Sequence, residues 1–246
     1  MIKDIARTLA GIAATAMAFS LSACDGMTVT VDDAPGVPLA KLDLSAKAPE
    51  EITLLGPDTV QVVQGDTLAI KVDGSDSIKD RLRFTLKDSK LAIGREGWKI
   101  GSSNDRATIE VTVPAATRLI MAGSGTIRAD ALRGPTTSVS IAGTGNIEVP
   151  SVDTDALKVE VIGSGDFKAS GKAKSLKVSI AGTGSADLAA LTTDSADVEI
   201  AGTGDASFAS DGTVSATIMG TGDVHVKGRA QCKVTAMGTG KLICEP

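Results

Sequence analysis

Glycine-rich turns are the first residues of this chain whose type and spacing could do chemistry. The pentapeptide Ile-Ala-Gly-Thr-Gly occurs three times, at residues 141–145, 180–184 and 200–204. Glycine loops after apolar strands cradle phosphate groups when a helix follows, because the N–H groups at the helix N-terminus face the anion. Here each turn is followed by another strand-like stretch. The pattern therefore disfavours a phosphate site and favours a structural role for the glycines.

Acidic residues beside these turns raise the question of a calcium site. Asp166, Asp205 and Asp223 directly follow the second glycine of their turns, and calcium-binding nonapeptide repeats also combine glycine turns with Asp. Those repeats place the Asp two residues after the glycine, whereas here it is adjacent, and other turns carry Asn, Ser or Lys in its place. We expect a solvated corner and no metal site.

A second acidic pair raises the question of polysaccharide cleavage, which needs two convergent carboxylates. Glu160 and Glu199 occupy equivalent places in repeats that are two units apart. Stacked coils would hold them about 9.6 Å apart, near the upper limit for an inverting glycosidase pair. No aromatic or arginine column accompanies them. We therefore expect no catalytic residue and no cofactor.

The composition narrows the classes of function. The chain has 246 residues, a formal net charge of −5 and one histidine, His225. The acidic balance argues against a nucleic-acid partner, and one histidine leaves little room for histidine catalysis or a histidine metal cluster. Apolar residues make up 42% of the chain and aromatic residues only 2%. A narrow core of small and β-branched side chains is therefore expected.

A repeat of near-constant length fills the C-terminal half. The unit Gly-Ser/Thr-Gly occurs seven times, with steps of 20, 20, 19, 20, 18 and 18 residues between the first glycines. Constant spacing of this kind indicates a solenoid. The turn glycines are Gly123, Gly125, Gly143, Gly145, Gly163, Gly165, Gly182, Gly184, Gly202, Gly204, Gly220, Gly222, Gly238 and Gly240.

Apolar and polar residues alternate on both sides of each turn. The positions two and four residues before the first glycine are apolar in every copy, as at Ile141 and Val139, and the positions between them are mostly polar. A second alternation follows the turn, as at Ile147 and Val149. A period of two is typical of a strand with one buried face. Each repeat therefore predicts a strand, a glycine corner, a second strand and a polar turn.

Two short strands cannot bury their own apolar face, but stacked copies can, with each strand about 4.8 Å from its counterpart in the next coil. We therefore predict an all-β fold, a right-handed parallel β-helix with coils of about 20 residues. A left-handed helix of six-residue repeats is the alternative, but its regular hexads are absent. At the corners, glycine supplies the restricted backbone dihedrals, and the Ser or Thr between the glycines is expected to form a hydroxyl ladder.

One column departs from the alternation. The residue just before the first glycine is apolar in every copy, and the column consists of Ala122, Ala142, Ile162, Ala181, Ala201, Met219 and Met237. Either the corner turns these side chains inward, which is the favoured interpretation, or they form an apolar contact stripe on the surface. In the second case, Met219 and Met237 are the first residues to test as a contact site.

The chain has three cysteines, Cys24, Cys232 and Cys244. The last two fall in apolar core columns of the final coil, and the end of a solenoid needs a cap. An odd cysteine in an exported protein needs an explanation. If Cys24 carries lipid, the other two can pair in an oxidising envelope. We therefore predict a disulfide between Cys232 and Cys244.

The N-terminus has the pattern of an export signal. Lys3 and Arg7 precede an apolar run over residues 9–21, which is too short to span a bilayer. The Leu-Ser-Ala-Cys motif that ends at Cys24 resembles the bacterial lipobox, which implies cleavage before Cys24 and lipidation of its thiol. Several acyl chains make a stable anchor. Asp25 resembles an inner-membrane retention signal, so the periplasmic side of the inner membrane is favoured, with the outer membrane as the alternative.

The expected organisation has four parts. Residues 1–23 are the signal peptide with its helix, and residues 24–38 are a tether. Residues 39–115 are irregular β coils of the same domain, with separate packing as the alternative. Residues 116–246 are the regular repeats.

Several stretches resemble a known family. The sequences PDTVQVVQGDTLAIKVDGSD, LAIGREG, SIAGTG and IMGTGDVHVKG resemble the bacterial head GIN domain, also called the putative auto-transporter adhesin head domain or DUF2807, over about residues 39–243. The resemblance implies a β-helical envelope domain with no catalytic residues to carry over.

The predicted function is that of a non-enzymatic cell-envelope lipoprotein, a β-helical scaffold or adhesin-like binding module. The expected partners are the membrane, through the N-terminal lipid, and an envelope polysaccharide or protein. A polysaccharide-acting β-helix enzyme, a lyase or hydrolase, is the alternative.

Overall fold

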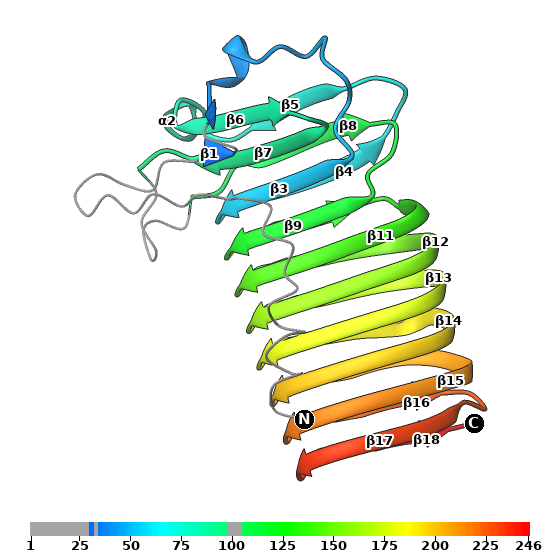
Figure 1. Cartoon of the computed structure of the whole chain (residues 1–246). Coiled ribbons are helices and arrows are strands. Elements are labelled where there is room, and N and C mark those ends of the chain that lie inside the picture. Colours follow the sequence, from blue (N-terminus) through cyan, green and yellow to red (C-terminus); the bar gives the residue numbers. More distant parts are fainter. Residues whose placement is uncertain (1–29, 32–33, 98–104) are drawn as a thin grey trace.

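A computed structural model describes residues 30–31, 34–97 and 105–246. The predicted signal peptide with its helix, and the predicted lipid-anchor residues Cys24 and Asp25, lie outside this part of the chain. The structure is 70% strand and 3% helix, and it forms a β-solenoid of about 6 turns with coils about 20 residues apart. In Figure 1 the long strands cross the near face from right to left, the chain returns behind them, and the coils descend toward the C-terminus, so the coil is right-handed as predicted.

The described part of the N-terminal third contains short strands and two short helices. They are β1 (Thr30–Val31), β2 (Ala34–Pro35), η1 (Leu39–Lys41), β3 (Glu51–Gly56), β4 (Thr59–Gln64), β5 (Ala69–Asp73), α2 (Asp76–Lys79), β6 (Leu82–Lys87), β7 (Lys90–Arg95) and β8 (Thr108–Val113). No helix in the described part of the chain is long and apolar enough to cross a membrane.

The regular coils follow. Their strands are β9 (Arg118–Gly123), β10 (Thr126–Ala129), β11 (Leu132–Gly143), β12 (Asn146–Gly163), β13 (Asp166–Gly182), β14 (Ser185–Gly202), β15 (Ala206–Gly220), β16 (Val224–Lys227), β17 (Gln231–Gly238) and β18 (Leu242–Glu245). Each coil pairs in parallel with the next, and equivalent positions face each other, as Ile141 faces Val161 and Val161 faces Ile180. The repeat alignment read from the sequence is therefore the physical register of the sheet.

Alternation along these strands produces one continuous core. The apolar positions on both sides of each corner are buried in β9 to β16, and a single cluster extends from Ile52 to Val226. The largest side chains in it, Phe84, Phe167 and Phe208, are at most 1% exposed. Columns of Ile, Val, Leu and Ala fill the rest, as the low aromatic content predicts.

The N-terminal strands extend this sheet with parallel strands and end it with antiparallel ones. β3 pairs in parallel with β9, and β4 pairs in parallel with β10. β6 and β5 add antiparallel partners to β7 and β8. In addition, Val37 exchanges backbone hydrogen bonds with Phe84 on β6. This contact differs from the prediction of a tether through residue 38, because the chain is already held to the sheet at Val37.

A buried ion pair lies under the first coil. The side chains of Arg95 and Asp58 form an ion pair and are 2% and 0% exposed. The Asp58 carboxylate also accepts a hydrogen bond from the N–H of Ala107 at 2.7 Å, and the Arg95 guanidinium donates to the carbonyl of Asp105 at 3.2 Å. These bonds compensate the cost of burying two charges.

The C-terminal end of the solenoid is uncovered in the structure. Every residue of β17 is exposed, and Val234, which lies in a core column, is 47% exposed. The core columns of the last coil are therefore exposed along this strand, although Cys232 and Val234 lie in register with the buried Val214 and Ala216 of β15. A disulfide joins Cys232 and Cys244 across this coil, with a Cα–Cα distance of 6.9 Å.

Candidate functional site

The corner glycines serve the backbone. The first glycine of every Gly-Ser/Thr-Gly turn has a positive φ, a conformation that glycine adopts without steric cost. At Gly202, where φ is +138°, a Cβ would also lie 2.1 Å from the carbonyl oxygen of Gly182 in the coil above. At Gly204 the same atom would lie 2.0 Å from the carbonyl oxygen of Gly184. The coils stack too closely at this edge for any side chain.

The acidic residues after the corners also have a structural task. One carboxylate oxygen of Asp205 accepts the backbone N–H of Asp223 in the next coil at 2.8 Å, and Asp223 accepts the N–H of Lys241 at 2.8 Å. Asp166 accepts the N–H of Ser185 at 3.1 Å. Each carboxylate therefore satisfies a donor of the following coil that the corner leaves without a ladder partner. Sequence reasoning missed this role, although the recurrence of Asp at one position was its signal.

The structure also places the other polar residues that the sequence analysis considered. The hydroxyls of Thr183 and Ser164 hydrogen-bond at 2.8 Å, which makes one rung of the expected ladder. His225 is an exposed side chain of β16. Glu160 and Glu199 lie two coils apart on the outer face of one sheet, with Ser179 between them. No group of three or more His, Cys, Asp or Glu side chains that could hold a metal occurs among the described residues.

The column before the corner glycines faces outward. Its side chains are partly or fully exposed in every coil, from Ala122 to Met237. Ile162 is 44% exposed and Met237 is 60% exposed. The favoured expectation that the corner turns these residues inward is therefore wrong, because the strand alternation continues up to the glycine. We call this column the apolar stripe. It consists of Ala122, Ala142, Ile162, Ala181, Ala201, Met219 and Met237.

A groove that the sequence did not single out lies on another side of the solenoid. It has a volume of about 620 Å³ and crosses the coils of β12 to β16. Its lining residues are Asp153, Thr154, Asp155, Lys172, Ala173, Lys174, Thr192, Thr193, Asp194, Ala209, Ser210, Asp211, Lys227, Gly228 and Pro246. Apart from Pro246, these residues belong to the polar turns of successive repeats, from β12 to the end of β16.

The groove arises from one inward side chain in each polar turn. Thr154, Ala173, Thr193 and Ser210 pair in register and are buried. The Thr154 hydroxyl donates to the carbonyl of Gly134 at 2.7 Å, which holds the turn against the coil above. The residues on either side of each inward side chain then point outward. They form two parallel rows with a hollow between them.

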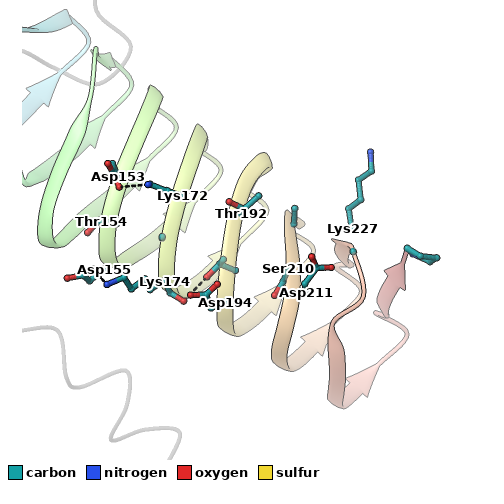
Figure 2. A pocket seen from close by; sticks show the side chains of 15 residues that line it. Asp153, Thr154, Asp155, Lys172, Lys174, Thr192, Asp194, Ser210, Asp211 and Lys227 are labelled. Atoms are coloured by element: carbon teal, nitrogen blue, oxygen red, sulfur yellow. Dashed lines mark hydrogen bonds and ion pairs between the residues drawn. The ribbon is translucent and has the colours of Figure 1, made fainter.

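Each row contains one lysine beside an aspartate of the coil above, as Figure 2 shows. In one row, Lys172 lies 3.6 Å from Asp153. In the other row, Lys174 lies 2.7 Å from Asp155. The hydrogen bond to Asp155 raises the pKa of Lys174 above its ordinary value, and the charges of Asp155 and Asp194 add to the effect. The groove therefore presents two ammonium donors on β13 beside carboxylate acceptors on β12, with Asp194 on β14 on the other side of Lys174.

This arrangement offers both donors and acceptors of hydrogen bonds. Ammonium groups donate hydrogen bonds and carboxylates accept them, so the two rows match a chain of hydroxyl groups, which do both. None of the lining residues is aromatic, a cysteine or a histidine. The signal in the sequence was the local pattern of charged, small, charged residues at 153–155 and 172–174.

A family model matches residues 48–230, and its description is "Putative auto-transporter adhesin, head GIN domain". The chain belongs to the DUF2807 family. The resemblance inferred from the sequence motifs is therefore confirmed. The match includes the coils that form most of the groove and the apolar stripe up to Met219.

Solved structures share the fold. A protein from Bacteroides fragilis, described as a putative adhesin, has a TM-score of 0.71 at 20% identity, over 81% of this chain and 93% of that chain. A protein from Parabacteroides distasonis, described as a putative lipid binding protein, has a TM-score of 0.65 at 20% identity over the same shares. A putative adhesin from Parabacteroides merdae has a TM-score of 0.65 at 18% identity, over 82% and 93%. A comparison with curated proteins finds no significant match.

Proposed function

We propose that this protein is a non-enzymatic envelope lipoprotein whose β-solenoid is an adhesin-like binding module, and that the groove holds an extended, neutral, hydroxyl-rich polysaccharide. The observation that supports it best is the groove itself, which crosses successive coils and carries a lysine–aspartate ion pair in each of its two rows. A description as an adhesin head domain and the adhesin descriptions of structural neighbours support the same function.

The charge pattern selects the chemical class of the polymer. The groove is lined by four aspartates and three lysines, so a polyanion would meet a carboxylate beside Lys172 and beside Lys174. A neutral glycan instead finds an acceptor or a donor for each hydroxyl, and charge-assisted hydrogen bonds contribute about 1.5–3 kcal/mol each. The absence of aromatic residues from the lining means that the affinity comes from hydrogen bonds distributed over several sugar units.

The proposed location follows from the N-terminal pattern. Cleavage before Cys24 and lipidation of its thiol would place the solenoid on the periplasmic side of a membrane, with the inner membrane favoured by Asp25. Metabolic labelling of cells with an alkyne fatty acid tests this step. The expected result is a labelled chain that loses its label in Cys24→Ala, and an unlabelled chain would contradict it.

The binding experiment uses a matched pair of lysine variants on β13. Lys172→Ala removes the Asp153 ion pair inside the groove, and Lys168→Ala removes the Asp187 ion pair outside it. Calorimetry with neutral and anionic bacterial polysaccharides is expected to show binding of a neutral polymer to the full chain. The expected loss of affinity is about tenfold in Lys172→Ala, from the loss of one charge-assisted hydrogen bond, and little change in Lys168→Ala.

Two outcomes would overturn the proposal. Equal losses in the two lysine variants would show that the groove is not the binding surface. Release of shorter products from the polymer, abolished by Glu160→Gln or Glu199→Gln, would show that the protein is an enzyme. The proposal expects binding to persist in both glutamate variants without product release.

A further inference from the structure

We infer that the groove binds its neutral glycan with one sugar ring per coil, so that the ligand is an extended chain of rings joined through equatorial bonds. This inference rests on the proposed function of the groove. The groove crosses five coils, from β12 to β16, and both of its rows run across these coils in Figure 2. A polymer in the groove therefore lies along the solenoid axis and meets a new coil at each step.

The step between coils sets the repeat of the ligand. Residues of the first row face each other in register, as Asp153 faces Lys172 and Lys172 faces Thr192. The step between such paired strands is about 4.8 Å. A six-membered sugar ring whose two linkage bonds are both equatorial extends a glycan by about this distance. Rings joined through an axial bond instead curve the chain into a helix, which cannot follow a row across all the coils of the groove.

The distance between the rows sets the orientation of each ring. The two outward side chains of a coil are two residues apart on one strand, as Asp153 and Asp155 are, so their Cα atoms are about 6.6 Å apart. Between them lie backbone and one small inward residue, such as the buried Ala173. None of the lining residues is aromatic, so no aromatic side chain stacks on the face of a ring. The rows therefore contact the edges of the ring, which selects rings with equatorial hydroxyl groups.

Every coil in the groove offers at least one side chain that can hydrogen-bond to a ring. By coil, these side chains are Asp153 and Asp155 on β12, Lys172 and Lys174 on β13, Thr192 and Asp194 on β14, Asp211 on β15 and Lys227 on β16. A hydroxyl group both donates and accepts, so the same ring fits the carboxylates of β12 and the ammonium groups of β13. A run of identical neutral rings can therefore occupy all five coils.

The two ends of the groove limit how many rings it holds. In β11, Arg133 faces Asp153 in register, but its side chain donates to the amide oxygen of Gln64 at 2.9 Å. Among the residues that line the groove, none belongs to β11, and Pro246 lines the groove at the C-terminal end. We therefore expect five rings in the groove, one for each coil from β12 to β16. Its volume of about 620 Å³ lies in the ordinary range of ligand sites, about 300–1,000 Å³.

Calorimetry with two series of glucose oligomers tests the repeat and the linkage on the full chain. Cello-oligosaccharides have equatorial linkages, and malto-oligosaccharides carry the same hydroxyl groups with one axial bond in each linkage. The association constant for cello-oligosaccharides should rise about fivefold with each ring, from one net hydrogen bond per ring, and should level off at five rings. Malto-oligosaccharides should show no such rise. Equal behaviour of the two series, or an affinity for cello-oligosaccharides that is independent of their length, would overturn the inference.

The number of coils provides a second measurement. Deletion of residues 183–202 removes one whole unit with β14, and duplication of the same residues adds one unit. The affinity should then level off one ring earlier in the deletion variant and one ring later in the duplication variant. Circular dichroism identifies the variants that keep the parent fold. An unchanged plateau in a folded variant would contradict the inference, and the two oligomer series on the parent chain decide it if neither variant folds.

The outcomes separate this inference from the proposed function. A parent chain that binds a neutral polysaccharide and loses affinity in Lys172→Ala, but shows no plateau with cello-oligosaccharides, keeps the proposed function and refutes the inference. A parent chain that binds no neutral polysaccharide refutes both.

Discussion

Replacing a corner glycine by alanine has two costs, the strain of a positive φ and a clash with the coil above. Three glycines of this chain allow the two costs to be measured separately. At Gly202, an alanine would need a left-handed backbone conformation and would also clash with the coil above. Gly56 has a φ of +131° but no atom within 4 Å of the added Cβ. Gly204 has no positive φ, yet its Cβ would lie 2.0 Å from the carbonyl oxygen of Gly184. The three positions therefore isolate the conformational cost, the clash and their sum.

The magnitudes follow from the two costs. A non-glycine residue at positive φ costs about 1–3 kcal/mol, overpacking costs about 1–3 kcal/mol, and alanine returns about 0.4–1 kcal/mol through the unfolded chain. Gly56→Ala and Gly204→Ala should each lower the free energy of unfolding by roughly 0.5–2 kcal/mol. Gly202→Ala should lower it by about 2–5 kcal/mol, since both costs apply. The carbonyl of Gly182 cannot retreat cheaply, because it accepts the N–H of Thr203 at 2.9 Å.

Urea unfolding followed by far-ultraviolet circular dichroism measures these differences on the parent chain and the three variants. The diagnostic result is that the loss in Gly202→Ala is close to the sum of the other two. A Gly204→Ala protein as stable as the parent would refute the steric part of the reasoning. A Gly202→Ala protein no less stable than Gly204→Ala would refute the conformational part.

Three further predictions concern the ends of the molecule and its charges. Arg95→Met leaves the fully buried carboxylate of Asp58 without its partner, so unfolding experiments should show a loss of about 3–5 kcal/mol, most of it recovered when Asp58→Leu is added. Replacing Cys232 and Cys244 by serine opens a loop with a sequence separation of 12, which should lower the free energy of unfolding by about 3 kcal/mol. Backbone hydrogen exchange should become faster in the last coil and remain unchanged in the central coils. Faster exchange in all coils alike would contradict a local role of the disulfide. The pKa of Asp187 is lowered chiefly by a hydrogen bond from Lys168. The ionised carboxylate therefore stabilises the fold at pH values above the ordinary pKa of 3.8, and this contribution is lost as the pH falls through the lowered pKa. In a pH series, the difference in unfolding free energy between the parent and Asp187→Asn should vanish at the acid end.

The repeat could be predicted because its cause is local. Alternation of period two around Ile141 and Ile147 defines the buried faces, and the constant spacing of the glycines defines the register between coils. Each strand finds its partner one repeat away, so no long-range pairing had to be inferred. The pairing of Cys232 with Cys244 followed from the same columns.

Two other features depend on packing that the alignment does not contain. The outward direction of the apolar stripe depends on where the strand stops alternating, and the structure shows that Ala142 still obeys the alternation one residue before Gly143. The groove depends on one small inward residue, such as Thr154 or Thr193, bending each polar turn. The alternation of apolar and polar residues cannot predict that a polar side chain such as Thr154 points into the core.

The close stacking of the corner glycines also determines how this architecture can change its length. A coil can be added or removed only as a whole unit with its own corner, because a partial insertion would bring a side chain against the carbonyl of the coil above. Each whole unit adds about 4.8 Å and extends the groove and the apolar stripe together. Duplication of one segment is then enough to lengthen the solenoid, and no existing contact has to be redesigned.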